Sequence, residues 1–426
     1  MTRITGSNAP VVFAVMAFAY FLSTLIRAIT ATIAPTLVAE FTLNARDLGL
    51  LAGGYFLGFA FTQLALGNWL DRYGPKRVEL VFLSVAVLGC VAFSMANSFM
   101  ALLLARVVCG IGVSACLMAP LTGYRRWFAP ETQLRTGSWM LMVGSLGMVA
   151  STLPVQWLLP ITGWRHIFMG LACAVVLGMV LIGRLVPHWH TAPAGATPAH
   201  PAVAPSLMER YAEIWRSRYF RRLVPIGFFS YGGLVAVQTL WAGPWMVRVA
   251  GFTAAQAAQG LFWINVGMLV AYWVWGLVNP WLARNRFPSE RVIKFVLPVA
   301  LVLLLTLIVQ ADRLASSTAL VWVLFCVAST AVTQLLPVIG MAFRPELAGR
   351  AMSAYNLIVF CGIFTVQWGI GLGIDGFKAL GFDTLQSYQG AMAIYALCSA
   401  ASYGFFLWYP VQADAPKRGG LTGADA

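Results

Sequence analysis

The chain has 426 residues, of which 60% are hydrophobic and only 10% are charged. Average globular domains carry roughly 25% charged residues, so this composition excludes a soluble globular protein. The net charge of +14 would suit a nucleic-acid-binding protein, but the distribution of the basic residues has a topological explanation.

Runs of about 20 apolar residues, each long enough to cross a bilayer, recur along almost the whole chain. The first run is too long for the hydrophobic region of a signal peptide, so we expect no cleavable signal. We predict an all-α membrane protein with twelve transmembrane helices, at 11–35, 48–70, 78–96, 99–123, 134–159, 164–186, 223–249, 259–282, 292–311, 317–343, 349–374 and 387–409.

The first run contains a basic residue, Arg27, about sixteen residues from its start and hence near the bilayer midplane. A charge at this depth is expensive and by default marks a functional site. Tyr20 lies on the same helical face. A guanidinium binds a carboxylate or phosphate through two hydrogen bonds. Arg27 therefore predicts an anion site; the alternative is an arginine satisfied by carbonyls and hydroxyls of neighbouring helices.

The segment between the second and third runs reads GNWLDRYGPKR, from Gly67 to Arg77. Its glycines permit a tight reversal, and Pro75 prevents the incoming helix from continuing. The pattern G-x-x-x-D-R-x-G-x-(K/R)-(K/R) resembles the signature loop between helices 2 and 3 of the major facilitator superfamily. The resemblance implies a loop that holds the two halves together on the cytoplasmic side, through Asp71 and Arg72. We expect a gating role for the residues that make up the pattern: Gly67, Asp71, Arg72, Gly74, Lys76 and Arg77.

The fourth run contains ARVVCGIG, which is similar to the R-x-x-x-G-x-G pattern of the same superfamily. The matching residues are Arg106, Gly110 and Gly112. In the family this arginine often works with a carboxylate on a neighbouring helix in proton coupling. We therefore add Arg106 and Gly110 to the residues expected to act in conformational change.

The first run and the loop after it resemble the organic anion and sugar-phosphate transporters of the superfamily. The residues that carry this likeness are Tyr20, Arg27, Pro35 and the EFTL segment at 40–43. In those transporters an arginine in helix 1 commonly contacts the anionic group of the substrate. The fifth run lacks the G-P-x-x-G-G sequence of drug–proton antiporters, which argues against that subfamily.

The middle of the chain predicts a division into two halves. Residues 188–222 begin with a Pro- and Ala-rich stretch typical of a flexible linker. They continue into an amphipathic helix that starts with a capping box of Ser206 and Glu209. We predict an N-terminal six-helix bundle at 1–187, a cytoplasmic linker at 188–222 and a C-terminal bundle at 223–426.

A shift of 211 residues aligns parts of the two halves, for instance Phe41-Thr42 with Phe252-Thr253. Two pseudo-symmetric bundles with a substrate site between them are the plan of this superfamily. The shift places Gln238 opposite Arg27, on a face of the seventh run. Other polar groups in the middle of runs are expected at the same site. Each of them alone more often forms hydrogen bonds that hold neighbouring helices together. The full set of expected substrate-binding residues is Arg27, Tyr20, Tyr55, Tyr231, Gln238, Trp241, Asn265, Gln334, Tyr355 and Asn356.

The basic residues indicate the orientation. Most of the 28 Lys and Arg residues fall in cytoplasmic segments if both termini are inside. The external loops then hold Arg46, Arg165, Arg248, Arg313 and Lys378. This asymmetry follows the positive-inside rule and predicts an inner-membrane protein with both termini in the cytoplasm. It also accounts for the net charge, so nucleic acid is not an expected partner.

The acidic residues and cysteines suggest no further chemistry. All fourteen Asp and Glu residues lie in loops, tails or helix ends, so we expect no carboxylate in the middle of a span. This favours exchange, facilitated diffusion, or coupling through a proton on the substrate. All seven cysteines lie in apolar runs and indicate neither a disulfide framework nor a metal site.

The sequence as a whole predicts a transporter, secondary active or facilitative, that moves a small organic anion by alternating access. It predicts no enzyme activity, no cofactor and a monomer in the lipid bilayer. Two alternatives stay open: an efflux transporter for neutral or cationic drug-like compounds, which usually has acidic membrane residues, and a transporter-like sensor.

Overall fold

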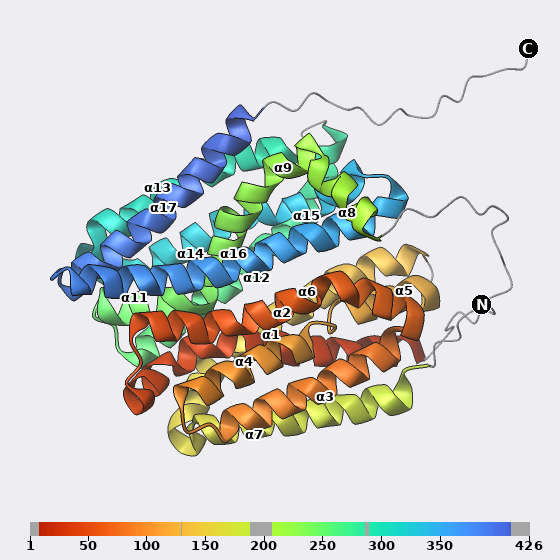
Figure 1. Cartoon of the computed structure of the whole chain (residues 1–426), viewed down its shortest axis with the longest axis horizontal. Coiled ribbons are helices and arrows are strands. Elements are labelled where there is room, and N and C mark those ends of the chain that lie inside the picture. The colour runs from red at the N-terminus through yellow and green to blue at the C-terminus, as the bar shows by residue number, and fades with distance from the viewer. Residues whose placement is uncertain (1–7, 129, 188–206, 286–288, 410–426) are drawn as a thin grey trace, which may run out of the picture.

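The structure is a computed structural model that describes residues 8–128, 130–187, 207–285 and 289–409. Every element within these ranges is a helix. Figure 1 shows two halves side by side, the N-terminal half in red to yellow and the C-terminal half in green to blue. Most of the predicted linker, 188–206, lies outside the described residues, and so does the predicted capping box.

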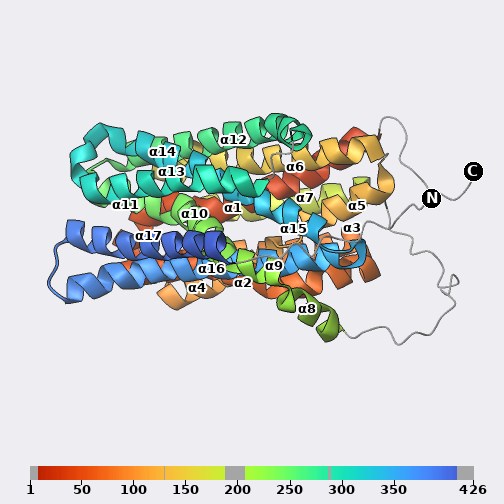
Figure 2. The same ribbon diagram turned by 90° about the horizontal axis from the view of Figure 1, so that it is seen from above.

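The N-terminal half comprises helices packed roughly along one direction (Figures 1 and 2). Their bounds are α1 (Asn8–Phe41), α2 (Ala45–Tyr73), α3 (Pro75–Ser94), α4 (Phe99–Val113), α5 (Met118–Trp127), α6 (Pro130–Ala150) and α7 (Leu153–Leu185). Polar side chains begin two of them, since Asn44 accepts from the Asp47 backbone at 2.8 Å and Ser98 accepts from that of Ala101 at 3.3 Å. Such caps satisfy amide groups that a helix leaves free at its start.

The C-terminal half follows the same plan with more interruptions. Two turns of π-helix, η1 (Ile226–Tyr231) and η2 (Val237–Trp241), interrupt its first long helix. The other elements are α8 (Leu207–Arg216), α9 (Arg218–Pro225), α10 (Gly232–Ala236), α11 (Ala242–Arg248), α12 (Ala254–Arg284), α13 (Ser289–Gln310), η3 (Ala311–Ser317), α14 (Thr318–Ser329), η4 (Thr330–Gln334), α15 (Leu335–Ala342), α16 (Pro345–Ala379) and α17 (Thr384–Trp408).

The described residues contain 10 segments that are long and apolar enough to span a membrane. One of them, Ser289–Ala342, reverses direction within η3 and therefore crosses twice. In α7 the backbone of Gly163 leaves helical geometry at φ 73°, which separates the residues before it from those after it. Together with α6, the first part of α7 supplies the remaining crossing. The predicted fold of twelve transmembrane helices in two bundles is thereby confirmed.

The halves meet most closely along α2 and α16, which run antiparallel. Gly49 lets the α2 backbone approach Gln367, because a Cβ there would overlap the carbonyl oxygen of that residue. Further along, the rings of Phe59 and Phe360 stack with centroids 4.3 Å apart. Small residues that allow close backbone approach are the usual basis of helix packing in membranes.

The two ends of the bundle differ in charge. We call the end at which α7 finishes and α9 begins the basic end, and the opposite end, where α1 passes into α2, the far end. At the basic end α8 contacts the C-terminal half through an ion pair between Arg344 and Glu213, with N and O 2.8 Å apart. The amphipathic helix predicted after the linker thus lies against α15–α16, with Ile214 buried.

Candidate functional site

Arg27 lies in the middle of α1, partly exposed, with its Cζ 5.5 Å from the centroid of the Phe59 ring. Its Nε atom is buried and has no hydrogen-bond partner in the described part of the chain. The groups that interact with it electrostatically include the hydroxyls of Tyr55, Tyr20 and Tyr231. Arg27 is absent from the ion pairs among the described residues. Its guanidinium therefore keeps donor capacity that a ligand could use.

Tyrosines from both halves interact electrostatically with this guanidinium. Tyr20 comes from α1 and Tyr55 from α2, while Tyr231 comes from η1 and Tyr272 from α12. We call these four residues and Arg27 the Arg27 cluster. It lies where the halves meet, and phenol hydroxyls can both donate and accept hydrogen bonds. The cluster can therefore bind the charged group of a small molecule and orient its polar substituents.

Tyr272 was not predicted from the sequence. It follows Asn265 by seven residues on the same helical face, and that spacing is the signal that could have identified it. A Tyr272→Phe variant should bind the transported anion a few times more weakly, because one neutral hydrogen bond contributes about 0.5–1.5 kcal/mol. Affinity is measured by calorimetry on purified protein. A Tyr403→Phe variant is the control, since that hydroxyl donates to the Lys294 carbonyl oxygen at 2.7 Å instead. Equal loss in both variants would contradict a role for Tyr272 at the site.

The π-helical turns of the seventh crossing carry three of the predicted residues, Tyr231, Gln238 and Trp241. Such turns shift the direction of side chains and often occur at functional sites. Gln238 donates from Nε2 to Oδ1 of Asn265 at 2.8 Å, and its Nε2 also lies 3.5 Å from the sulfur of Met148 in the other half. The structure thus brings Gln238 and Asn265 together at the boundary between the halves.

Two predicted residues are engaged within the C-terminal half. The Trp241 ring is fully buried, and its Nε1 donates to the backbone oxygen of Gln367 at 2.9 Å. Gln334 accepts a hydrogen bond from Asn279 at 2.9 Å. Because these polar groups already have partners inside one half, we leave both residues out of the site proposed below.

Tyr355 and Asn356 lie on α16, close to the boundary. Tyr355 is fully buried, and within the residues that the structure describes its hydroxyl has no hydrogen-bond partner. It interacts electrostatically with Tyr231. Asn356 donates to Oε1 of Gln63 in the other half at 3.1 Å. Tyr355 therefore extends the Arg27 cluster, whereas Asn356 connects the two halves.

Arg106 donates hydrogen bonds to the α1 backbone at Arg27. Its Nη1 donates to the Ile26 carbonyl at 2.9 Å and its Nη2 to that of Arg27 at 3.5 Å. The guanidinium also lies 5.0 Å from the Tyr55 ring centroid and 6.0 Å from that of Phe93. We interpret Arg106 as a positioning residue that fixes α1 at Arg27. The predicted conformational role of Arg106 stays a prediction.

Gly110 has a role in helix packing. A Cβ at this position would overlap the backbone oxygen of Tyr55 in α2. Gly110→Ala should therefore destabilise the protein by about 1–3 kcal/mol, the usual cost of overpacking, and displace Tyr55. The midpoint of thermal unfolding in detergent measures this. Gly170→Ala is the control, because no atom lies within 4 Å of a Cβ there. Equal stability of the two variants would show that α2 and α4 do not depend on this contact.

The signature loop forms a tight reversal at the basic end. Gly74 has φ 79°, a conformation that favours glycine, and Pro75 begins α3. Lys76 donates to the carbonyl oxygens of Gly183 and Val186 at 2.8 and 2.6 Å. A cation there stabilises the carbonyl end of α7. This contact was not predicted from the sequence.

The gating role expected for this loop stays a prediction. The Asp71 side chain lies outside the described residues. Arg72 and Arg77 are exposed, and the Arg72 guanidinium lies 5.3 Å from the ring centroid of Tyr73. Gly67 has open space where a Cβ would be.

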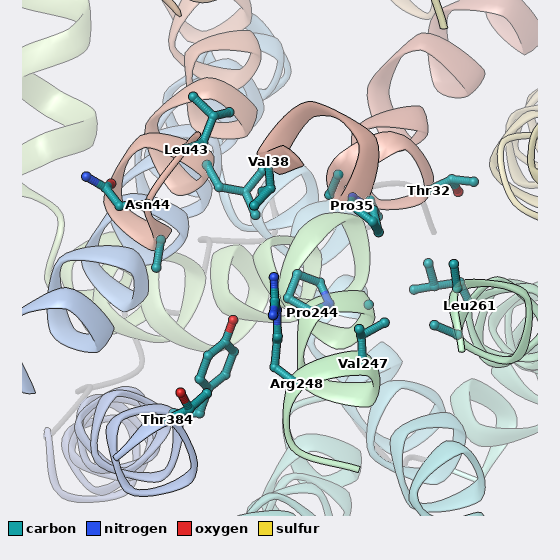
Figure 3. A pocket seen from close by; sticks show the side chains of 18 of the residues that line it. Thr32, Pro35, Val38, Leu43, Asn44, Pro244, Val247, Arg248, Leu261 and Thr384 are labelled. Atoms are coloured by element: carbon teal, nitrogen blue, oxygen red, sulfur yellow. The ribbon is translucent and has the colours of Figure 1, made fainter. Parts of the chain in front are cut away.

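A cavity of about 380 Å³ lies between the halves toward the far end. In Figure 3 the Arg248 side chain extends beside Pro244 of α11 toward α1. Lys378 and Tyr388 also line it, but none of the predicted site residues does. Its α1 lining starts at Ala31, four residues and about 6 Å beyond Arg27 at the normal helical rise.

A contact between the halves closes one side of this cavity. The carboxylate of Asp375, at the end of α16, accepts hydrogen bonds from the backbone N–H groups of Ala45 and Arg46 at 3.2 and 2.7 Å. These amides begin α2, where the helix dipole favours a negative charge. We call this pair of hydrogen bonds the outer contact.

Residues 16–366 match the model of the Major Facilitator Superfamily. The chain is 25% identical to a probable sulfoacetate transporter of Cupriavidus necator over 58% of its length and 59% of the relative. It is 24% identical to a probable L-galactonate transporter of Escherichia coli, over 88% of its length and 84% of the relative. The first curated relatives are matched over 32–59% of their own length.

The structure is similar to that of a bacterial homolog of the human lysosomal transporter Spinster in an inward-facing, unoccupied conformation. The TM-score is 0.74 at 18% sequence identity, with 94% of this chain and 97% of the other covered. The likeness shows a shared fold. With a family match over most of the chain and spans that agree with it, the chain is a multi-pass membrane transporter, not an enzyme, and belongs to the Major Facilitator Superfamily.

Proposed function

We propose that this protein carries a small organic anion across the inner membrane of a bacterium-like cell by alternating access. The site is the Arg27 cluster, extended by Tyr355 from α16 and by the pair Gln238 and Asn265. Binding between the halves is what alternating access requires, because the same site must open to each side in turn.

One observation carries the proposal: a guanidinium at membrane depth without a carboxylate partner among the described residues. An unpaired charge in a low-dielectric site is costly, and an entering anion would neutralise it. A carboxylate, sulfonate or phosphate also fits the two parallel donors of the guanidinium. A cationic ligand would instead meet repulsion at Arg27.

The far-end cavity supports a path to this site. It begins about one helical turn beyond Arg27 and is lined by the basic residues Arg248 and Lys378. The acid in its lining, Asp375, is occupied by the outer contact. Positive charge along a cavity raises the local concentration of anions. Opening of the outer contact would then expose the path.

The distribution of basic residues supports the orientation. We place the basic end in the cytoplasm, because Lys and Arg residues are enriched in cytoplasmic loops. The far end, with the cavity, then faces the outside of the cell. The relatives named as transporters of sulfoacetate and L-galactonate support the substrate class, since both compounds are organic anions.

A thermal-shift screen of the purified protein tests the proposal. Carboxylates, sulfonates and phosphates should raise the unfolding midpoint, because a ligand that binds only the folded state stabilises it. Hydrophobic cations of similar size should not. Stabilisation by cations alone would favour drug efflux. Stabilisation by anions that also exchange across proteoliposome membranes would establish transport and argue against a sensor.

A further inference from the structure

Glu79 is an acidic residue in the membrane region that the proposed site does not use. It lies one turn into α3, is 0% exposed, and neither carboxyl oxygen has a hydrogen-bond partner among the described residues. Glu79 lies near the start of α3, as the sequence predicts, but its side chain is buried. From the sequence we expect no carboxylate within the membrane that could couple transport to protons. The burial of Glu79 removes the reason for that expectation.

The nearest cation along α3 does not neutralise Glu79. Lys76, three residues earlier, directs its ammonium to the Gly183 and Val186 carbonyls. The Arg106 side chain on α4 is committed to carbonyls of α1. Arg72 on α2 and Arg184 on α7 are exposed.

Among the described residues, the groups that interact electrostatically with Glu79 are the neutral side chains of Cys116 and Tyr124. Cys116 lies in the turn between α4 and α5, and Tyr124 lies on α5. The side chains of Asp71, Arg125 and Arg126, on α2 and α5, lie outside the described residues. An ionised carboxylate without water or a partner is far more costly than a neutral carboxylic acid. Burial in this conformation therefore favours the protonated form of Glu79.

The same neighbourhood connects Glu79 to the Arg27 cluster. Cys116 also interacts electrostatically with Arg27 and lies beside Ser23 of α1. The helical hydrogen bonding of the fourth crossing is interrupted here, because α4 ends at Val113 and α5 begins at Met118. Such an interruption is a place where the packing around a buried acid can change.

We propose that Glu79 is a proton-binding site that couples the conformational equilibrium of this transporter to pH. The Glu79 carboxylate takes up one proton from water, becomes the neutral acid that burial favours in this conformation, and returns that proton to water when another conformation hydrates it. The inference deepens the proposed function, because a proton would then accompany the anion bound at Arg27. An anion at Arg27 would lower the potential at Glu79 and favour protonation.

The sign of the pH effect follows from proton linkage. The conformation of this structure binds the proton, so acid favours it and alkali favours the alternative. For a single proton the ratio of the two conformations changes by up to about tenfold per pH unit. Spin labels on exposed Arg184 of α7 and exposed Met341 of α15 report the separation of the halves at the basic end.

The test compares the wild-type protein with Glu79→Met and Glu79→Gln, and needs no substrate. Infrared spectra of the wild-type protein at neutral pH should contain the carbonyl stretch of a buried carboxylic acid, and both variants should lose it. Their label distances should stay at the acid-side distribution of the wild type at every pH. Glu213→Gln, an exposed acid in α8, is the control and should keep both properties.

Several outcomes would overturn the proposal. One is the absence of the carboxylic acid band from the wild-type protein, a result that does not depend on the folding of any variant. Others are a band that persists in Glu79→Met, or label distances in Glu79→Met that titrate as in the wild type. Arg27→Lys should retain the band, so failure at Arg27 and failure at Glu79 are distinguishable.

Discussion

Arg27→Ala should bind the transported anion at least roughly thirtyfold more weakly than the wild-type protein. The guanidinium and the anion would form a charge-assisted pair in a desolvated site, and truncation of one partner of such a pair costs about 2–5 kcal/mol. Arg27→Lys should recover only part of the affinity, because an ammonium keeps the charge without the two parallel donors. Calorimetry on monodisperse protein measures both.

Arg313→Ala serves as the control for general charge effects, since this exposed arginine lies at the far end in η3. A structural arginine at position 27 would give a different pattern, in which truncation lowers the yield of folded protein but not its affinity. Efflux of cationic drugs would make Arg27→Ala neutral or beneficial. Normal anion binding by folded Arg27→Ala would refute the site.

Asp375→Asn should shift the protein toward conformations that are open at the far end. The variant loses the negative charge that accepts from Ala45 and Arg46 at the start of α2. A loss of about 1–2 kcal/mol changes a two-state ratio by a factor of roughly 5–30. Spin labels on exposed Met95 and Leu380 measure this as a longer distance between the far ends of the halves.

Asp383→Asn is a matched control for this prediction. Asp383 also begins a helix at the far end, but its carboxylate accepts from Gln386 within its own half at 2.7 Å. The control should lower stability without changing the distance between the labels. An unchanged distance in Asp375→Asn, or an equal change in both variants, would show that the outer contact does not hold the halves together.

The sequence was sufficient for the spans because hydrophobic length alone defines a crossing. The predicted gap between the fifth and sixth spans, 160–163, coincides with the break at Gly163. The gap between the ninth and tenth spans falls inside η3. The interruptions of the seventh span could not be predicted, since a single π turn adds too little to disturb the apolar run.

The site was predictable only in part. Arg27, Tyr20 and Tyr55 stand out because polar groups are rare in these runs, and the structure brings them together with Tyr231. Trp241 and Gln334 also stood out, yet their partners lie within one half, which a linear sequence does not reveal. From the sequence, Glu79 counts among the acids at helix ends, because a sequence gives only the position along a helix. Whether water reaches the carboxyl group depends on burial in the fold, and Glu79 is buried.

The central claim is that the guanidinium of Arg27 recognises the negative charge of the substrate. Its most direct test is the affinity of an anion and of its neutral amide for wild-type protein and for Arg27→Met. The wild-type protein should prefer the anion, and Arg27→Met should lose that preference while still binding the amide. The same preference for the anion in both proteins would contradict the account.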